Sequence, residues 1–203
     1  MSNPLTKFQF DLSGGNLALD FANTVSFRLT DATERLVDYT HLMLFGMQTG
    51  VLTQIDRLAM VAGQSPGRAK SALQKAIQFR EHLHAIFTAV AEHRIVPGNS
   101  LAHLTFMLQE GANYGRIVQR DRRLVWEWTD LRFHLDGLLW PIARAAADLL
   151  TSDEIESVRL CAAKDCGWLF LDKTKNQRRR WCDMKVCGNR TKARRHYERV
   201  KSA

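Results

Sequence analysis

Apolar residues recur at steps of three and four along most of the first 150 residues, which is the spacing of helices that bury one face. The longest such pattern predicts a helix over about 68–93, opened by Ser65-Pro66-Gly67. Shorter patterns predict further helices at 30–48, 53–62, 99–110 and 130–150. Pro141 is expected to kink or restart the last of these. Alternation on both sides of the charged segment QRDRR predicts a β-hairpin over 116–128.

Charge and cysteine content divide the chain near residues 151–157. The 203 residues carry 29 Lys and Arg against 21 Asp and Glu, a net charge of +8. Residues 1–158 contribute −2 (15 basic, 17 acidic), and residues 159–203 contribute +10 (14 basic, 4 acidic). All four cysteines also lie in the second stretch. We therefore predict a helical domain over 1–150 and a small basic module over 151–203.

The four cysteines form the pattern C-x4-C-x15-C-x4-C, with Cys161, Cys166, Cys182 and Cys187 as its members. Two short-spaced pairs of thiolates can supply the four ligands of a tetrahedral structural zinc ion. A module this small buries little apolar surface, so metal binding would supply much of its folding free energy. Reduced structural thiols, two disulfides and an iron–sulfur cluster are the alternatives. The surrounding positive charge favours one structural zinc ion.

The sequence around the cysteines predicts a short hairpin that pairs 157–160 with 168–171, followed by a helix from Asn189 to Val200. We expect Ala193, Tyr197 and Val200 to form a face that docks on the metal module. Basic side chains cover the rest of that helix and the segment before Cys182, where they can neutralise nucleic-acid phosphates. A solvated basic surface without a partner is the alternative. The candidate DNA-binding residues are Arg178, Arg179, Arg180, Arg190, Lys192, Arg194, Arg195 and Arg199.

Three polar residues stand among apolar neighbours in the N-terminal part. Asp20 and Asn23 lie in the segment GGNLALDFANT, and Arg80 interrupts the apolar stripe of the longest helix. Buried charges need partners, so we expect Asp20 and Asn23 to meet Arg80. They would do so either as a structural pair or as the polar end of a ligand pocket. The alternative is that Arg80 extends to solvent at the edge of the stripe and that Asp20 caps a helix.

The cysteine region resembles the CGNR zinc finger family. The matching features are both cysteine pairs with their spacing, Phe170 and Asp172, the RRWC word at 179–182 and the CGNR word at 187–190. The segment GGNLALDFANT resembles the start of the ABATE domain, which precedes this finger in a family of stress-induced transcription regulators. The resemblance implies that the four cysteines bind zinc and that a treble-clef-like or knuckle-type finger binds DNA. For the N-terminal domain it implies a sensing or ligand-binding role.

These observations predict a mainly α, cytoplasmic, DNA-binding transcription regulator. Its N-terminal domain would sense a small-molecule effector or mediate homodimerisation, and no apolar run is long enough to predict a membrane span. One alternative is an RNA- or protein-binding adaptor in which zinc is a structural clip. Another is an enzyme with a pocket around Asp20, Asn23 and Arg80. Because the metalloprotease, hydrolase, P-loop and dinucleotide motifs are missing, we expect no enzymatic activity.

Overall fold

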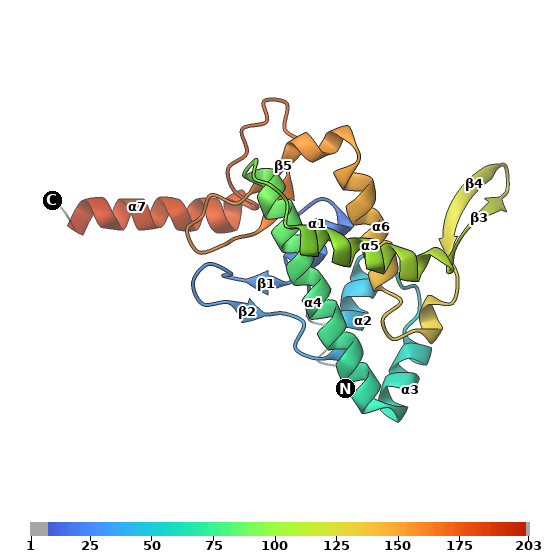
Figure 1. Cartoon of the computed structure of the whole chain (residues 1–203). Helices are drawn as coiled ribbons and strands as arrows, with labels where there is room; N and C mark the ends of the chain where they lie inside the picture. The colour runs from blue at the N-terminus through green and yellow to red at the C-terminus, as the bar shows by residue number, and fades with distance from the viewer. Residues whose placement is uncertain (1–7, 202–203) are drawn as a thin grey trace.

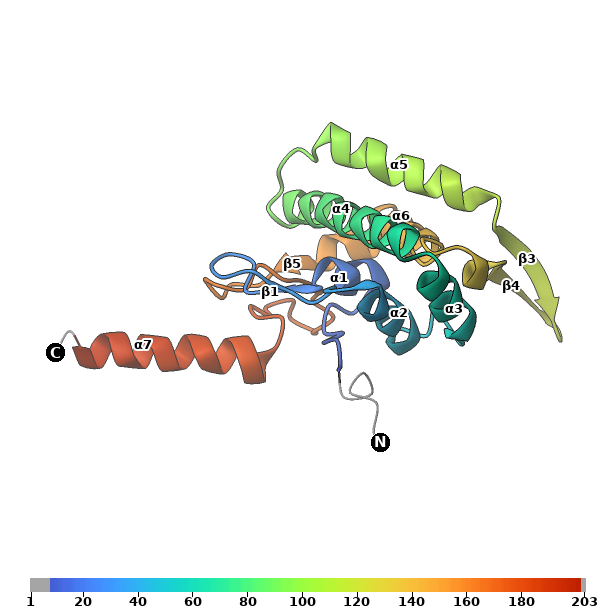
Figure 2. The ribbon, with the colours of Figure 1, turned by 90° about the horizontal axis from the view of Figure 1, so that it is seen from below.

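The body of the protein is a group of helices that surround one apolar core (Figures 1 and 2). The structure is a computed structural model that describes residues 8–201. The longest helix, α4 (Pro66–Ala91), packs against α1 (Leu17–Ala22), α2 (Tyr39–Gln48), α3 (Asp56–Gln64) and α5 (Gly98–Ala112). Helix α6 (Leu139–Leu150) packs against α1 and α5. The largest fully buried side chains include Phe21, Phe45, Phe79 and Phe87.

Helix α4 confirms the helix predicted over 68–93. Pro66 stands in its first turn, where the missing N–H breaks no helical hydrogen bond. Ala69, Ala76, Leu83 and Phe87 of the predicted stripe are buried. The face of α4 that carries this stripe is therefore the face that packs against the core.

Three helices begin later than predicted, and the helix expected over 53–62 does so by three residues, at Asp56. The helix expected over 30–48 begins at Tyr39, because the Asp38 side chain accepts the His41 N–H and caps it there. The preceding Thr33–Glu34 is instead β2, paired with β1 (Val25–Ser26) in a hairpin that was not predicted. The helix expected over 130–150 is divided into a 3-10 turn, η2 (Leu131–Phe133), and α6. Pro141 lies in the first turn of α6 and so marks a restart.

The hairpin predicted over 116–128 is confirmed. Strands β3 (Gly115–Arg120) and β4 (Arg123–Trp128) pair in antiparallel fashion around a two-residue turn. Asp121 in that turn has a φ of 53°, which is typical of such turns. The hairpin projects from the body of the protein (Figures 1 and 2).

The C-terminal segment contains a second predicted hairpin, formed by β5 (Val158–Leu160) and β6 (Leu169–Leu171) after a 3-10 turn, η3 (Asp153–Ser157). A π-helical turn, η4 (Met184–Gly188), then leads directly into α7 (Asn189–Lys201). Asn189 is therefore the first residue of a continuing helix, and the side-chain cap is provided by Asp183, which accepts the Val186 N–H.

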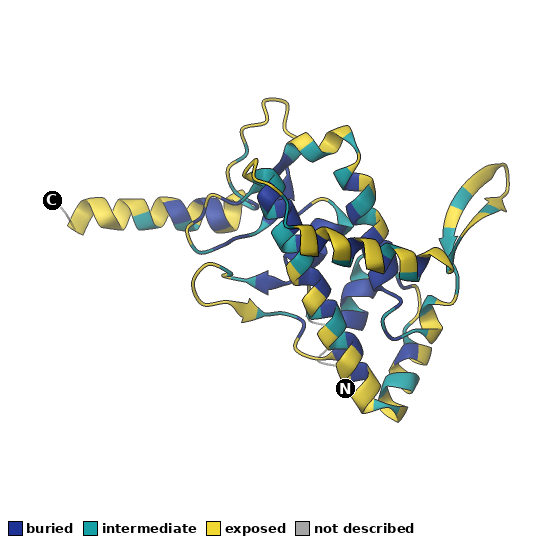
Figure 3. Cartoon of the chain, in the orientation of Figure 1, coloured by how far each residue is buried: buried dark blue, intermediate teal, exposed yellow. Residues whose placement is uncertain are grey.

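Helix α7 extends away from the body and is exposed over most of its length (Figures 1–3). The expected docking face is wrong, since Tyr197 and Val200 are 67% and 64% exposed. The helix is anchored at its first turn, where the Thr191 hydroxyl donates to the Cys187 carbonyl, Arg190 pairs with Asp165 and η4 packs alongside. The rest of the helix is overwhelmingly polar, so packing against the finger would bury little apolar surface.

Strand β6 contributes to two apolar clusters at once. Leu169 and Leu171, with Val158 of β5, belong to the main core. The intervening Phe170 packs with the four cysteines in a smaller cluster. Alternate residues of a strand point to opposite faces, so this single strand joins the finger to the helical body.

Candidate zinc centre and basic surface

The four cysteines lie together and are all buried. Their Sγ atoms are all within 4.8 Å of one another, and the Cys166–Cys182 and Cys182–Cys187 sulfurs are 3.6 Å and 3.5 Å apart. These separations are too long for disulfides, in which sulfurs are about 2.05 Å apart. A tetrahedron of sulfurs about 2.3 Å from a zinc ion has edges of about 3.8 Å. The cluster therefore fits one zinc ion held by four thiolates.

Local backbone geometry positions each pair of cysteines. The Cys161 N–H donates to the Trp168 carbonyl at the end of the β5–β6 hairpin, and the Cys166 N–H donates to the Ala163 carbonyl. In the second pair, Cys187 lies in the η4 turn. The Cys182 N–H points at the Cys161 sulfur, 3.4 Å away. Donors of this kind stabilise thiolate charge, as ligands to a metal require.

The loop between the pairs is organised by Asp172, which is buried. Its carboxylate accepts hydrogen bonds from the Thr174 N–H, the Thr174 hydroxyl and the Arg179 N–H. Although burial alone would raise the pKa of Asp172, these hydrogen bonds lower it below its ordinary value. Asp172 is thus a fixed anion that shapes the loop leading to Cys182. An Asp followed two residues later by a Thr is typical of such a turn, so the Asp172-x-Thr174 spacing could have identified the turn from the sequence.

Two of the eight candidate DNA-binding residues are turned into the finger. Arg179 lies 4.5 Å from the Phe170 ring centroid and donates to the carbonyls of Trp181 and Cys182. Arg190 forms an ion pair with Asp165 at 3.0 Å, and its Nη2 lies 3.4 Å from the Cys187 sulfur. Partial burial opposes its charge, but the Asp165 carboxylate and the thiolates of Cys187 and Cys166 raise the pKa of Arg190.

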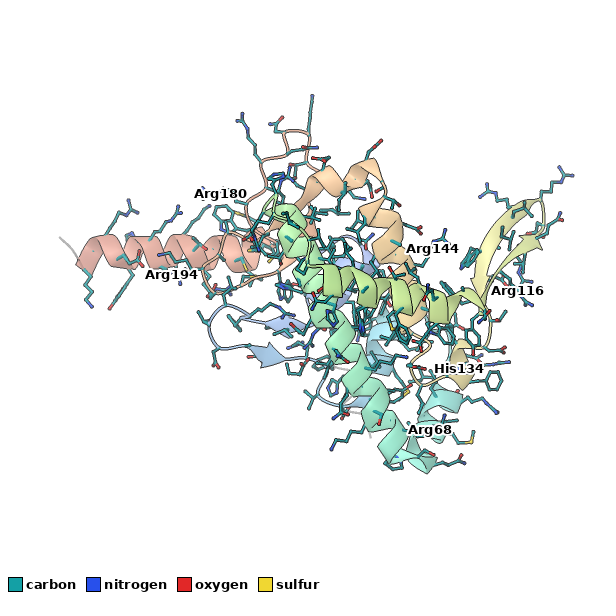
Figure 4. All side chains as sticks on the ribbon, viewed as in Figure 1. Arg68, Arg116, His134, Arg144, Arg180 and Arg194 are labelled. Carbon is teal, nitrogen blue, oxygen red and sulfur yellow. The ribbon has the colours of Figure 1, made fainter. Side chains whose placement is uncertain are left out.

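The other six lie at the surface, on the 173–180 loop and on α7. Figure 4 labels Arg180 and Arg194, which represent these two segments. Arg194 is half-buried, and the other five are exposed: Arg178, Arg180, Lys192, Arg195 and Arg199. The structure thus brings most of the predicted cations onto two neighbouring segments that leave the zinc site.

The expected meeting of Asp20 and Asn23 with Arg80 is wrong. Arg80 is buried, but it pairs with Glu34 at 2.6 Å and with Glu81 at 2.8 Å. Glu34 comes from the β1–β2 hairpin, which the sequence pattern did not predict. The arginine needed an anion as argued, and the anion comes from a different element.

Asp20 and Asn23 nevertheless line a cavity of about 270 Å³ between the N-terminal segment and the zinc site. Asp20 accepts the Gly14 N–H at 2.8 Å, and a Cβ at Gly14 would lie only 2.7 Å from that carboxylate oxygen. Burial raises the pKa of Asp20 to about 6, against the lowering effect of the Gly14 hydrogen bond. The finger contributes Trp168, Asp183 and Val186 to the opposite wall. Arg80 does not line the cavity, so the three-residue pocket is reduced to two of its members.

Asn23 has a second role that sequence reasoning missed. Its side-chain amide donates to the Leu169 carbonyl at 2.8 Å and accepts the Leu169 N–H at 2.9 Å. Trp168 makes a parallel link, because its indole N–H donates to the Val25 carbonyl at 2.6 Å. These contacts hold the finger against the N-terminal part.

A helical body joined to a four-cysteine centre defines a zinc-finger protein, and comparison with family models identifies its family. Residues 15–153 match ABATE, described as "Putative stress-induced transcription regulator", and residues 157–200 match the CGNR zinc finger. The chain belongs to the ABATE family and has a CGNR zinc finger after that domain. Neither match is to an enzyme family.

A search of curated proteins finds no match. Among residues 8–201, every helix is too short or too polar to cross a membrane.

Proposed function

We propose that this protein is a DNA-binding transcription regulator whose zinc finger contacts duplex DNA. The observation that supports this most is α7, a basic helix that leaves the zinc site and extends into solvent (Figure 3). The major groove of B-DNA is about 12 Å wide and admits one α-helix. A helix anchored by its first turn to a metal centre presents its length to such a groove.

The charge of the finger supports a phosphate partner. Residues 159–203 carry +10, and four thiolates around one divalent zinc ion change this to about +8. The six surface cations of α7 and the 173–180 loop would contact phosphates and base edges. Arg179 and Arg190 would act indirectly, because their guanidinium groups already bind carbonyls, Asp165 and a cysteine sulfur within the finger.

The cavity at Asp20 and Asn23 supports a role in sensing a small-molecule effector. Its walls come from both parts of the chain, and Asp183 and Val186 belong to the capped turn from which α7 begins. A ligand that binds better to one position of that turn would shift the position of α7. We propose that effector binding at this cavity alters DNA affinity.

The direct test is a binding titration of the full zinc-loaded chain with duplex DNA at several salt concentrations, with RNA of the same sequence as a competitor. The affinity should fall steeply with salt, since each phosphate contact releases a counterion. The same chain stripped of zinc by a chelator should bind much more weakly. Affinity that is independent of salt, or a clear preference for RNA, would overturn the proposal, and the latter would favour the adaptor hypothesis.

A further inference from the structure

The β3–β4 hairpin exposes an apolar face far from the zinc centre. Ile117, Leu124 and Trp126 are 67%, 74% and 44% exposed. Ile117 pairs with Trp126 and Gln119 pairs with Leu124, so the three apolar side chains share one face of the hairpin. An isolated two-stranded hairpin is at best marginally stable in water. The Arg144 guanidinium lies 5.0 Å from the Trp126 ring centroid, whereas Ile117 and Leu124 remain exposed.

Both strands of the hairpin have a free edge. Within residues 8–201 the sheet contains only β3 and β4, and no third strand covers either side. Exposed edges of this kind can pair with a strand of another chain. Which edge would do so depends on the side chains that pairing would place opposite one another.

The charges favour self-pairing of β4. Antiparallel pairing of two copies about a two-fold axis at Val125 places Arg123 opposite Glu127 of the second copy and Leu124 opposite Trp126 of the second copy. Each of these pairs occurs twice because a two-fold interface is reciprocal. Within the part of the chain that the structure describes, Arg123 forms no ion pair with its own chain, so its charge is available.

The other edge is disfavoured by the same reasoning. Pairing of two β3 strands about Val118 would place Arg116 opposite Arg120 of the second copy, and like charges directly opposite one another are destabilising. Both carboxylate oxygens of Glu127 accept from Arg120 within the hairpin, at 2.6 Å and 2.9 Å, and Arg123 of a second copy would add a second cation beside this carboxylate. Self-pairing of β4 thus brings opposite charges together, whereas self-pairing of β3 brings like charges together.

We propose that two copies of this chain associate through β4, in antiparallel register about Val125, to form a four-stranded sheet. The hairpin and α7 project from opposite ends of the body (Figures 1 and 2). In Figure 4, Arg116 marks the hairpin end and Arg194 marks the α7 end. The dimer therefore leaves both basic helices uncovered and presents two fingers from one assembly.

The test compares charge reversals that change net charge equally. Sedimentation of the full zinc-loaded chain without DNA should show a dimer. R123E should raise the dimer dissociation constant at least about tenfold, because Glu would face Glu127 of the second copy twice. R123E also places Glu opposite Arg120 within the hairpin, so it should not unfold the strand. R122E, in the turn between the strands, is the matched control and should remain dimeric.

Register is tested by cross-linking. V125C should form an intermolecular disulfide with oxidised glutathione, since residues opposite each other in an antiparallel pair are within disulfide range. V118C, on the partner strand of the same hairpin, should not. A monomeric wild-type chain, equal weakening by R122E and R123E, or equal cross-linking of the two cysteine variants would overturn the proposal. Lower DNA affinity in R123E with unchanged mass would instead assign the hairpin to nucleic-acid contact. Because sedimentation is measured without DNA, failure of the DNA-binding proposal would leave this result intact.

Discussion

The side chain of Asn23 pairs with the backbone of Leu169 as a neighbouring β-strand would, donating to its carbonyl and accepting its N–H. The two residues are 146 positions apart, and Asn23 is 2% exposed. One amide therefore satisfies two buried backbone groups and joins the end of α1 to the finger.

Removal of this amide should destabilise the whole chain. N23A leaves the Leu169 N–H and carbonyl without partners in a buried site, which costs about 2–4 kcal/mol of unfolding free energy. Chemical denaturation of the zinc-loaded chain measures the change. N176A, at an exposed position of the finger loop, is the control and should change stability by less than about 0.5 kcal/mol. Equal stability of N23A and wild type would show that water replaces the amide.

The raised pKa of Asp20 predicts how stability depends on pH. In the folded chain burial raises this pKa to about 6 from an ordinary value of 3.8, so the native state binds the proton more tightly than the unfolded state. This contribution favours folding at low pH and is lost as the pH rises from about 4 to about 6. D20N keeps an oxygen for the Gly14 N–H but carries no charge. Relative to wild type, D20N should therefore gain up to about 3 kcal/mol over that range.

Denaturation of D20N and wild type at matched pH values from about 3 to about 7 tests this expectation. Below pH 4 the two proteins should respond to pH in parallel. A difference between them that is constant across the range would mean that Asp20 titrates normally.

Loss of one cysteine should abolish metal binding. C182S replaces a thiolate with a hydroxyl that does not ionise near neutral pH, so zinc content should fall from one ion per chain to well below one. Trp168 and Trp181 pack beside the cluster, and their fluorescence should change as the finger loosens. M184A, two residues further along in the η4 turn and with an exposed side chain, should retain one zinc ion. Full zinc content in C182S would contradict a four-thiolate site.

Substitution of a finger arginine should have one of two effects, either weaker DNA binding or lower stability of the finger. R195A removes an exposed cation and should weaken DNA binding with a salt slope reduced by about one, without loss of stability. R179A removes hydrogen bonds to the Trp181 and Cys182 carbonyls and should lower zinc affinity and thermal stability. R68A, on α4, is the control for the loss of an exposed arginine charge and should leave both properties unchanged. If R179A kept full stability while weakening DNA binding as R195A does, Arg179 would be a direct contact.

Patterns that depend on neighbours in the chain were predicted well. The stripe of α4, the β3–β4 hairpin and the β5–β6 hairpin each follow from local periodicity and turn residues. Zinc binding by the four cysteines also followed from their spacing, because few other sites combine two short-spaced pairs with such a basic sequence.

Features that depend on distant contacts were missed. The two-residue strands β1 and β2 have no periodicity of their own, so Glu34 could not be recognised as the partner of Arg80. The apolar residues at 193, 197 and 200 of α7 have helical spacing, yet Tyr197 and Val200 remain more than half exposed. Periodicity identified the helix but could not decide whether that face has a partner within the chain.

The alternating residues of β6 also connect zinc availability to heat tolerance. Phe170 faces the cysteines, while Leu169 and Leu171 face the helical core. Stabilisation of the finger therefore also restrains the part of the core that contains these two leucines. A metal ion that binds only the folded finger stabilises it in proportion to the logarithm of the free zinc concentration. The melting temperature of the helical body, remote from the metal, should therefore rise with the zinc supplied to the chain.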